Sequence, residues 1–147
     1  MKDILKYTLL VLIVALFFQC KKEDFQPVVE IPDDNFLNAL IEQGVDKNGD
    51  GIISPEEAEA VTYLDISGTY DTTRIITNIQ GIEAFTNLDT FKCSSNQITS
   101  LDVSNNFALE WLDCGENNLT SLDVSKNIAL TGLRCSGNQL TSLDVSN

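Results

Sequence analysis

The chain has 147 residues, enough for one domain with a short appendage. It carries 9 basic and 22 acidic side chains, and its net charge of −13 argues against binding the phosphate backbone of nucleic acids. Histidine is absent, so the usual general base and the commonest zinc ligand are missing. No Cys-x-x-Cys pair indicates a zinc or redox site. We therefore expect a protein that is not an enzyme.

An apolar, uncharged run, "YTLLVLIVALFF" (7–18), follows a weakly basic start. It is shorter than the ~20 residues that span a bilayer and suits the core of a signal peptide. Cys20 resembles the lipidated first residue of a mature bacterial lipoprotein, although Phe17 and Phe18 depart from the usual residues before it. The resemblance implies a signal peptide over 1–19, a tether over 20–31 and a lipid anchor in the outer membrane or cell surface. Secretion is the alternative.

Residues 32–63 are predicted to form a helical cap. Asp33 or Asp34 is placed to begin a helix of two to three turns that stops at Gly44. A second helix is expected from the capping sequence at Ser54 to about Tyr63.

The segment "DKNGDGIISPEE" (46–57) lies between these helices and matches the twelve-residue calcium loop of EF-hands. Calcium requires six to eight oxygen ligands, which alternate positions of such a loop supply. The expected ligands are Asp46, Asn48, Asp50, the Ile52 carbonyl, Ser54 and Glu57. The cap is thus EF-hand-like, with calcium as its expected cofactor. The alternative is an acidic turn that merely covers the next coil, with Glu57 engaged in capping its helix.

Residues 88–147 repeat with a period of 21, seen in the steps from Cys93 to Cys114 to Cys135. The shared pattern Leu-x-x-Leu/Phe-x-Cys-x-x-Asn-x-Leu/Ile resembles the leucine-rich-repeat signature. The isoleucines of 75–88 resemble the entry repeat of bacterial surface leucine-rich-repeat proteins. The resemblance implies an α/β repeat solenoid over 64–147, a right-handed coil with a parallel sheet that follows the helix–loop–helix cap. Because the last repeat is incomplete, we expect either a longer protein or an interface at that end.

Each repeat is expected to contribute one strand, about 4.8 Å from the next, and equivalent residues stack in columns. The cysteine column is predicted to be core packing, not disulfides or a metal site. The asparagine column should satisfy buried backbone groups. The aspartate column should bond to its own turns, with bound cations as the alternative. The last two columns are Asn96, Asn117 and Asn138, and Asp102, Asp123 and Asp144.

The concave face of the sheet is the usual binding surface of such solenoids. Lys92, Asp113 and Arg134 should stand side by side there, with Trp111 exposed as an anchor for a protein partner or, less favoured, a glycan. Alternatively, Trp111 only packs on the neighbouring Lys92 and Arg134 stems. The predicted function is therefore non-covalent binding at the cell surface. A spacer or calcium-responsive scaffold for a missing C-terminal region is the alternative.

Overall fold

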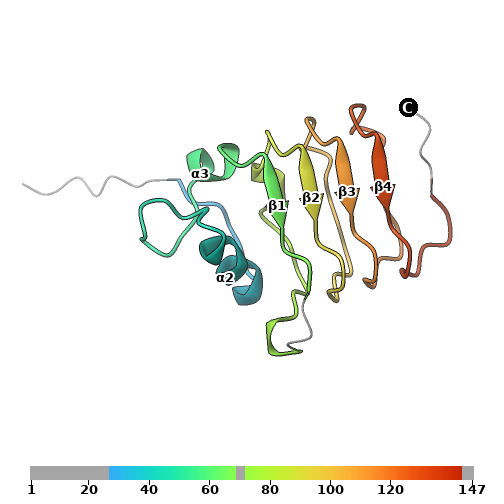
Figure 1. Cartoon of the computed structure of the whole chain (residues 1–147), viewed down its shortest axis with the longest axis horizontal. Helices are drawn as coiled ribbons and strands as arrows, with labels where there is room; N and C mark the ends of the chain where they lie inside the picture. The colour runs from blue at the N-terminus through green and yellow to red at the C-terminus, as the bar shows by residue number, and fades with distance from the viewer. Residues whose placement is uncertain (1–26, 69–71, 144–147) are drawn as a thin grey trace, which may run out of the picture.

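The computed structural model describes residues 27–68 and 72–143. Four parallel strands form one sheet in the order β1-β2-β3-β4, and two α-helices pack at its β1 end (Figure 1). The elements are α2 (Asp34–Glu42), α3 (Pro55–Glu59), β1 (Tyr63–Asp65), the 3-10 turns η1 (Thr72–Arg74) and η2 (Ile82–Ala84), β2 (Thr90–Lys92), β3 (Trp111–Asp113) and β4 (Gly132–Arg134). Among the described residues, no helix is long and apolar enough to cross a membrane. Cys20 and the predicted signal peptide lie outside them.

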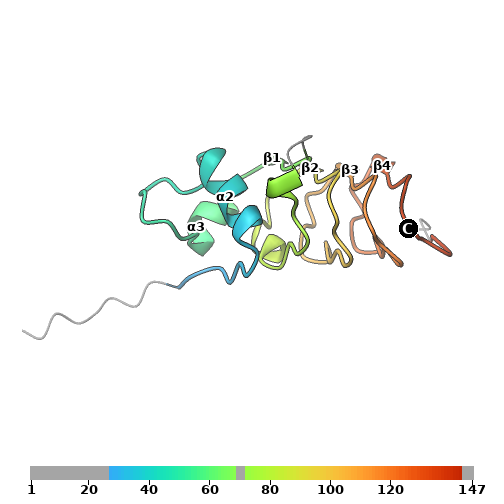
Figure 2. The ribbon, with the colours of Figure 1, turned by 90° about the horizontal axis from the view of Figure 1, so that it is seen from below.

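The repeats form successive coils along the long axis of the molecule (Figure 2). Their strands are in register, so that Leu64, Phe91, Leu112 and Leu133 are aligned across the sheet. This confirms one strand per repeat and the parallel sheet. β1 adds a fourth strand at the start of the expected solenoid (64–147), where the sequence analysis had not assigned a strand.

The interior of the coils holds the apolar columns. The first three residues of the aligned leucine and phenylalanine column are fully buried. Cys93 and Cys114 are buried free thiols, and Cys135 is partly buried, so the prediction of core packing is confirmed. Burial raises the pKa of Cys114 to about 12 and that of Cys93 well above its ordinary value. These thiols therefore stay protonated and unreactive at neutral pH.

The asparagine column joins each coil to the one before it. Asn117 donates to the carbonyl oxygens of Cys93 at 3.0 Å and of Cys114 at 3.2 Å, and its Oδ1 accepts from the Ile98 N–H at 3.0 Å. Asn96 and Asn138 make the equivalent bonds one coil to either side. Each amide thus satisfies backbone groups that the strand leaves unpaired where the chain turns away from the sheet. The predicted structural role is confirmed.

A second asparagine column, which the sequence analysis had not singled out, follows the first one along each coil. Asn106 and Asn127 are completely buried. Their side-chain amides donate to two carbonyl oxygens of the preceding coil, at 2.9 Å each. Among buried side-chain atoms of the described residues, the Oδ1 atoms of these two asparagines lack a hydrogen-bond partner. The repeated 21-residue step between the two residues was the signal for this column.

The cap is fastened to the first coil through Asp33. Its Oδ1 accepts from the N–H groups of Asn35 and Phe36 and so begins α2, as predicted. Its Oδ2 accepts from the N–H and hydroxyl of Thr77. Partial burial alone would raise the pKa of Asp33, but bonds from Thr77 and Phe36 hold the pKa below its ordinary value. One carboxylate therefore orders both the helix and the entry to the repeats.

The β1 edge of the sheet is covered by a side chain from the cap. Gln43 follows α2, donates to the carbonyl oxygen of Asp65 at 2.5 Å and accepts from its N–H at 3.4 Å. A side-chain amide thus takes the place of a neighbouring strand along β1. The second helix is shorter than predicted. α3 ends at Glu59 because the chain must extend by Tyr63 to enter β1.

Replacing Asn117 by alanine should lower the free energy of unfolding by about 2–4 kcal/mol, because the buried carbonyl and N–H groups of two coils lose their partners. Urea unfolding followed by circular dichroism measures the change. Asn105→Ala is the control, because this asparagine lies in an exposed turn outside the column. It should change the free energy of unfolding by less than about 0.5 kcal/mol. Equal effects of the two variants would contradict the role of the column.

Candidate functional site

The concave sheet face presents the first and third residue of every strand, because the middle residue points into the core. The first positions form the row Tyr63, Thr90, Trp111 and Gly132. The third positions form the row Asp65, Lys92, Asp113 and Arg134. The structure thus brings the predicted binding residues together on one face. It also adds Tyr63, which the sequence analysis had assigned to the end of a helix, and Asp65, which lies at the start of the expected solenoid.

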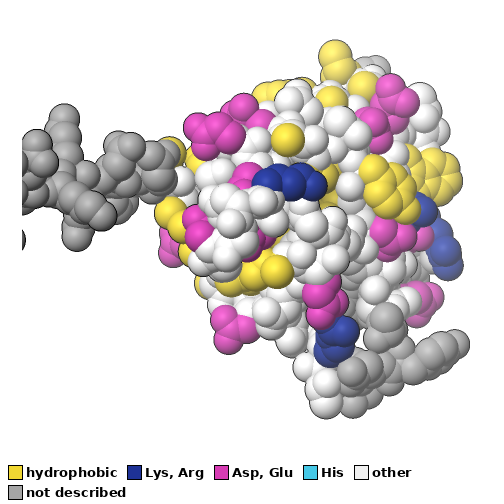
Figure 3. All heavy atoms as spheres, turned by 60° about the vertical axis from the view of Figure 1, so that its left-hand side comes forward, with side chains coloured by type: hydrophobic (Ala, Val, Ile, Leu, Met, Phe, Trp, Pro, Cys, Tyr) yellow, Lys and Arg dark blue, Asp and Glu magenta, His cyan; other side chains and the backbone are white. Residues whose placement is uncertain are grey.

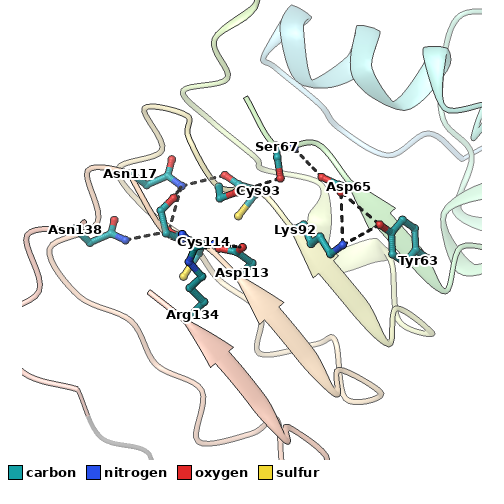
Figure 4. A network of polar contacts seen from close by, with 12 residues as sticks. Tyr63, Asp65, Ser67, Lys92, Cys93, Asp113, Cys114, Asn117, Arg134 and Asn138 are labelled. Atoms are coloured by element: carbon teal, nitrogen blue, oxygen red, sulfur yellow. Dashed lines mark hydrogen bonds and ion pairs between the residues drawn. The ribbon is translucent and has the colours of Figure 1, made fainter. Parts of the chain in front are cut away.

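Charges alternate along the third row. Lys92 forms an ion pair with Asp65, with 3.7 Å between Nζ and Oδ2, and Arg134 pairs with Asp113, with 3.5 Å between Nη1 and Oδ2 (Figure 4). The predicted order of Lys92, Asp113 and Arg134 is confirmed, but Lys92 forms its ion pair with Asp65. Asp113 is itself nearly buried, so Arg134 is the more exposed partner of its pair.

Tyr63 completes a small network at the β1 end of this row. Lys92 Nζ lies 3.1 Å from the Tyr63 hydroxyl and 5.2 Å from the centre of its ring. The hydrogen bond to Tyr63 raises the pKa of Lys92. Partial burial raises the pKa of Asp65, but hydrogen bonds from Ser67 and the charge of Lys92 lower it more, to below its ordinary value. Both members of the pair therefore remain charged at neutral pH.

Trp111 stands exposed in the first row, with 44% of its surface accessible. Its ring lies over the next strand, because a Cβ added to Gly132 would come within 2.1 Å of the indole Cε3 atom. Glycine is needed here for close approach of the ring and not for backbone conformation. The ring rests on the Gly132 backbone, an arrangement that neither of the two sequence-based alternatives had included.

The loop of residues 46–57 folds back on itself between the two helices. The Asp46 carboxylate accepts from the N–H groups of Gly49 at 2.7 Å and Gly51 at 2.9 Å. Asn48 and Asp50 each accept from the N–H two residues further on. These bonds set the oxygen-bearing side chains of the loop in successive turns.

Glu57 joins the end of the loop to its beginning. Its Oε1 accepts from the Lys47 N–H at 2.8 Å, and its Oε2 accepts from the N–H and hydroxyl of Ser54 at 3.0 Å. The Ser54 N–H, above all, lowers the pKa of Glu57 below its ordinary value. Both carboxylate oxygens are therefore engaged in hydrogen bonds, partly as the capping box of α3.

The donor set of the loop is right in kind for calcium, since all six predicted ligands offer oxygen atoms. In the described part of the chain, however, no three histidine, cysteine or acidic side chains gather as a metal-binding group. The order of the ligands thus fits calcium, while Glu57 would have to exchange its capping bonds for the ion.

The aspartate column lies away from the concave face, and its predicted turn bonds are present in two of its members. Asp102 accepts from the Ser104 N–H and Asp123 from the Ser125 N–H, each at 2.9 Å. Asp144 lies outside the described residues. The two aspartates line a shallow polar groove together with Ser100, Ser121 and Lys126.

Comparisons with known proteins agree with this architecture. No family model matches the chain, and no curated protein matches it significantly. Among solved structures, the functional domain of InlJ from Listeria monocytogenes, described as including a cysteine ladder, is similar with 40% identity and a TM-score of 0.67 over 78% of this chain. An internalin (inlF) of the same organism is similar over 84% of this chain, with 23% identity and a TM-score of 0.66.

The chain spans 24% of the length of the first of these structures and 40% of the second. The parallel sheet, the 21-residue coils and these similarities together define the fold as a leucine-rich-repeat solenoid. Partners and activities of the longer proteins do not transfer with the fold.

Gly132→Ala should displace the Trp111 ring, because the added methyl group would overlap the indole. Trp111 is the only tryptophan of the sequence, so its fluorescence reports the change directly. We expect emission at longer wavelength and stronger quenching by acrylamide. Thr90→Ser, on the other in-register neighbour of Trp111, serves as control and should leave emission unchanged. An unchanged spectrum in Gly132→Ala would show that the ring does not rest on Gly132.

Proposed function

We propose that this protein binds a protein or glycan partner non-covalently on its concave face, with Trp111, Lys92, Asp113 and Arg134 as contact residues. The observation that carries the proposal is the exposed Trp111 ring supported by Gly132 beside the Asp113–Arg134 pair. A rigidly held aromatic ring loses little conformational entropy on binding, and an arginine beside it adds directional hydrogen bonds.

The fold supports the same proposal, because leucine-rich-repeat solenoids use their concave sheet for recognition. The side chains of that sheet offer charged pairs and an aromatic anchor but no histidine base. Recognition is therefore favoured over catalysis.

The proposal places the protein at the outer membrane or cell surface through a lipid anchor on Cys20. Its support is the sequence pattern at residues 1–24. A two-chain lipid anchor holds a protein stably on a membrane, and the polar tether would keep the solenoid clear of the headgroups.

The proposal also includes calcium as a stabiliser of the cap. The loop has the ligand order of an EF-hand, and its side chains lie in the consecutive turns described above. A weak extracellular site, with a dissociation constant of about 10⁻⁴–10⁻³ M, would fill at the millimolar calcium concentrations outside cells.

Trp111→Ala and Arg134→Glu should each abolish capture of immobilised partners. The panel would contain purified extracellular proteins and polysaccharides, and surface plasmon resonance would measure binding. The melting temperature of Trp111→Ala should stay within about 2 °C of that of the unmodified chain, because the side chain is exposed. Arg134→Glu should lower it, because a second carboxylate then faces the nearly buried Asp113, so circular dichroism must show that this variant is folded at the temperature of the binding assay. Phe107→Ala, an exposed aromatic residue outside the strands, is the matched control and should retain capture. Retained capture in both face variants would contradict the proposal.

Millimolar calcium should raise the free energy of unfolding by about 1–2 kcal/mol, and chelator should reverse the effect. Asp50→Asn should remove the calcium response while keeping an oxygen that accepts from the Ile52 N–H. Glu56→Gln, at an exposed acidic residue of the loop that is not among the expected ligands, should respond like the unmodified chain. Titration calorimetry measures calcium binding to the loop directly. An identical melting curve in calcium and in chelator would refute the calcium proposal.

A further inference from the structure

The concave face contains the same group of side chains twice. β1 and β3 each carry an aromatic residue at the first position and an aspartate at the third, as Tyr-Leu-Asp and Trp-Leu-Asp. β2 and β4 each carry a cation at the third position. Each aspartate forms an ion pair with the cation of the strand that follows it. We name these the two modules: Tyr63, Asp65 and Lys92 in the first, and Trp111, Asp113 and Arg134 in the second.

In both modules the aromatic ring is supported by the following strand. Lys92 lies against the Tyr63 ring, and Gly132 lies under the Trp111 ring. Both rings remain half exposed, at 52% and 44%. Support from one side leaves the rest of each ring open to a ligand.

The modules are related by a step of two strands. In-register parallel strands are spaced about 4.8 Å apart, so equivalent atoms of the two modules are separated by about 10 Å. The two modules on the four strands are thus one such step apart. The face therefore matches a linear ligand that presents the same surface on two units about 10 Å apart.

We propose that the ligand of the concave face is a neutral β-1,4-linked glycan that runs across the strands, with one sugar ring stacked on Trp111 and another, two sugars along, near Tyr63. The inference rests on the proposed function and names its partner class. In such a glycan successive sugars alternate in orientation, so every second ring presents the same face over a length comparable to the module step.

The chemistry of each module suits a sugar. A pyranose has an apolar C–H face that packs on an aromatic ring, and hydroxyl groups at its rim that both donate and accept hydrogen bonds. Beside each ring, a lysine or arginine offers donors. The partly exposed Asp65 also offers acceptors, whereas the nearly buried Asp113 holds Arg134 in place.

Charge on the face favours a neutral ligand. The four charged strand residues of the face cancel, with two acids and two bases. On the side of the molecule drawn in Figure 3, acidic side chains are scattered over the surface and basic ones are fewer. A neutral ligand therefore meets no net repulsion on this face.

Titration of the protein with β-1,4-linked hexasaccharides and disaccharides of glucose and of N-acetylglucosamine tests the inference, with Trp111 fluorescence as the readout. At least one hexasaccharide should give a saturable change and bind about tenfold more tightly than its disaccharide, because only the longer chain reaches both modules. Tyr63→Ala should remove this tenfold advantage and leave disaccharide binding unchanged. Phe107→Ala, the control, should leave both the tenfold advantage of the hexasaccharide and disaccharide binding unchanged.

Equal affinities for the long and short glycans, or no saturable response to any of the four, would overturn the inference. If a purified protein or a proline-rich peptide binds through Trp111 and Arg134 while the glycans do not, the glycan assignment fails and the proposed function stands. If neither glycans nor proteins bind through these residues, both fail.

Discussion

The structure depends on a buried asparagine that bridges each coil to the preceding one. After every strand the chain turns sharply, and the turn leaves backbone carbonyl and N–H groups inside the molecule. Asn96, Asn117 and Asn138 pair with these groups in two coils at once. Because an unsatisfied buried polar group is costly, a slip of one residue between coils would be strongly unfavourable. Apolar packing stabilises the solenoid, and the asparagines fix its register.

That register creates the concave face. Only with equivalent residues side by side does Asp113 reach Arg134, and only then does the Trp111 ring lie over a glycine and not over a side chain. Trp111 and Arg134 therefore owe their positions to the column of asparagine amides that follows the ends of the strands.

The sequence predicted the repeats because their period is long and free of insertions: the strands β2–β4, the buried cysteines and the asparagine column all follow from a 21-residue step. It did not predict β1, because the first coil has neither the cysteine nor the asparagine of the signature and Tyr63 followed a helical pattern. Contacts between distant segments were also missed. Gln43 pairs with a strand 22 residues away, and no local pattern encodes such a bond. The ion pair between Lys92 and Asp65 could not be predicted either, because Asp65 lies on β1.

Hydrogen exchange of the amides bonded to the asparagine column tests this account most directly. The N–H groups of Ile76, Ile98 and Leu119 each donate to the Oδ1 atom of an asparagine in the next coil. If the column holds the coils in register, these three amides should exchange only through global unfolding, as slowly as the strand amides of β2 and β3. Exchange as fast as that of exposed turn amides such as Asn105 would contradict it.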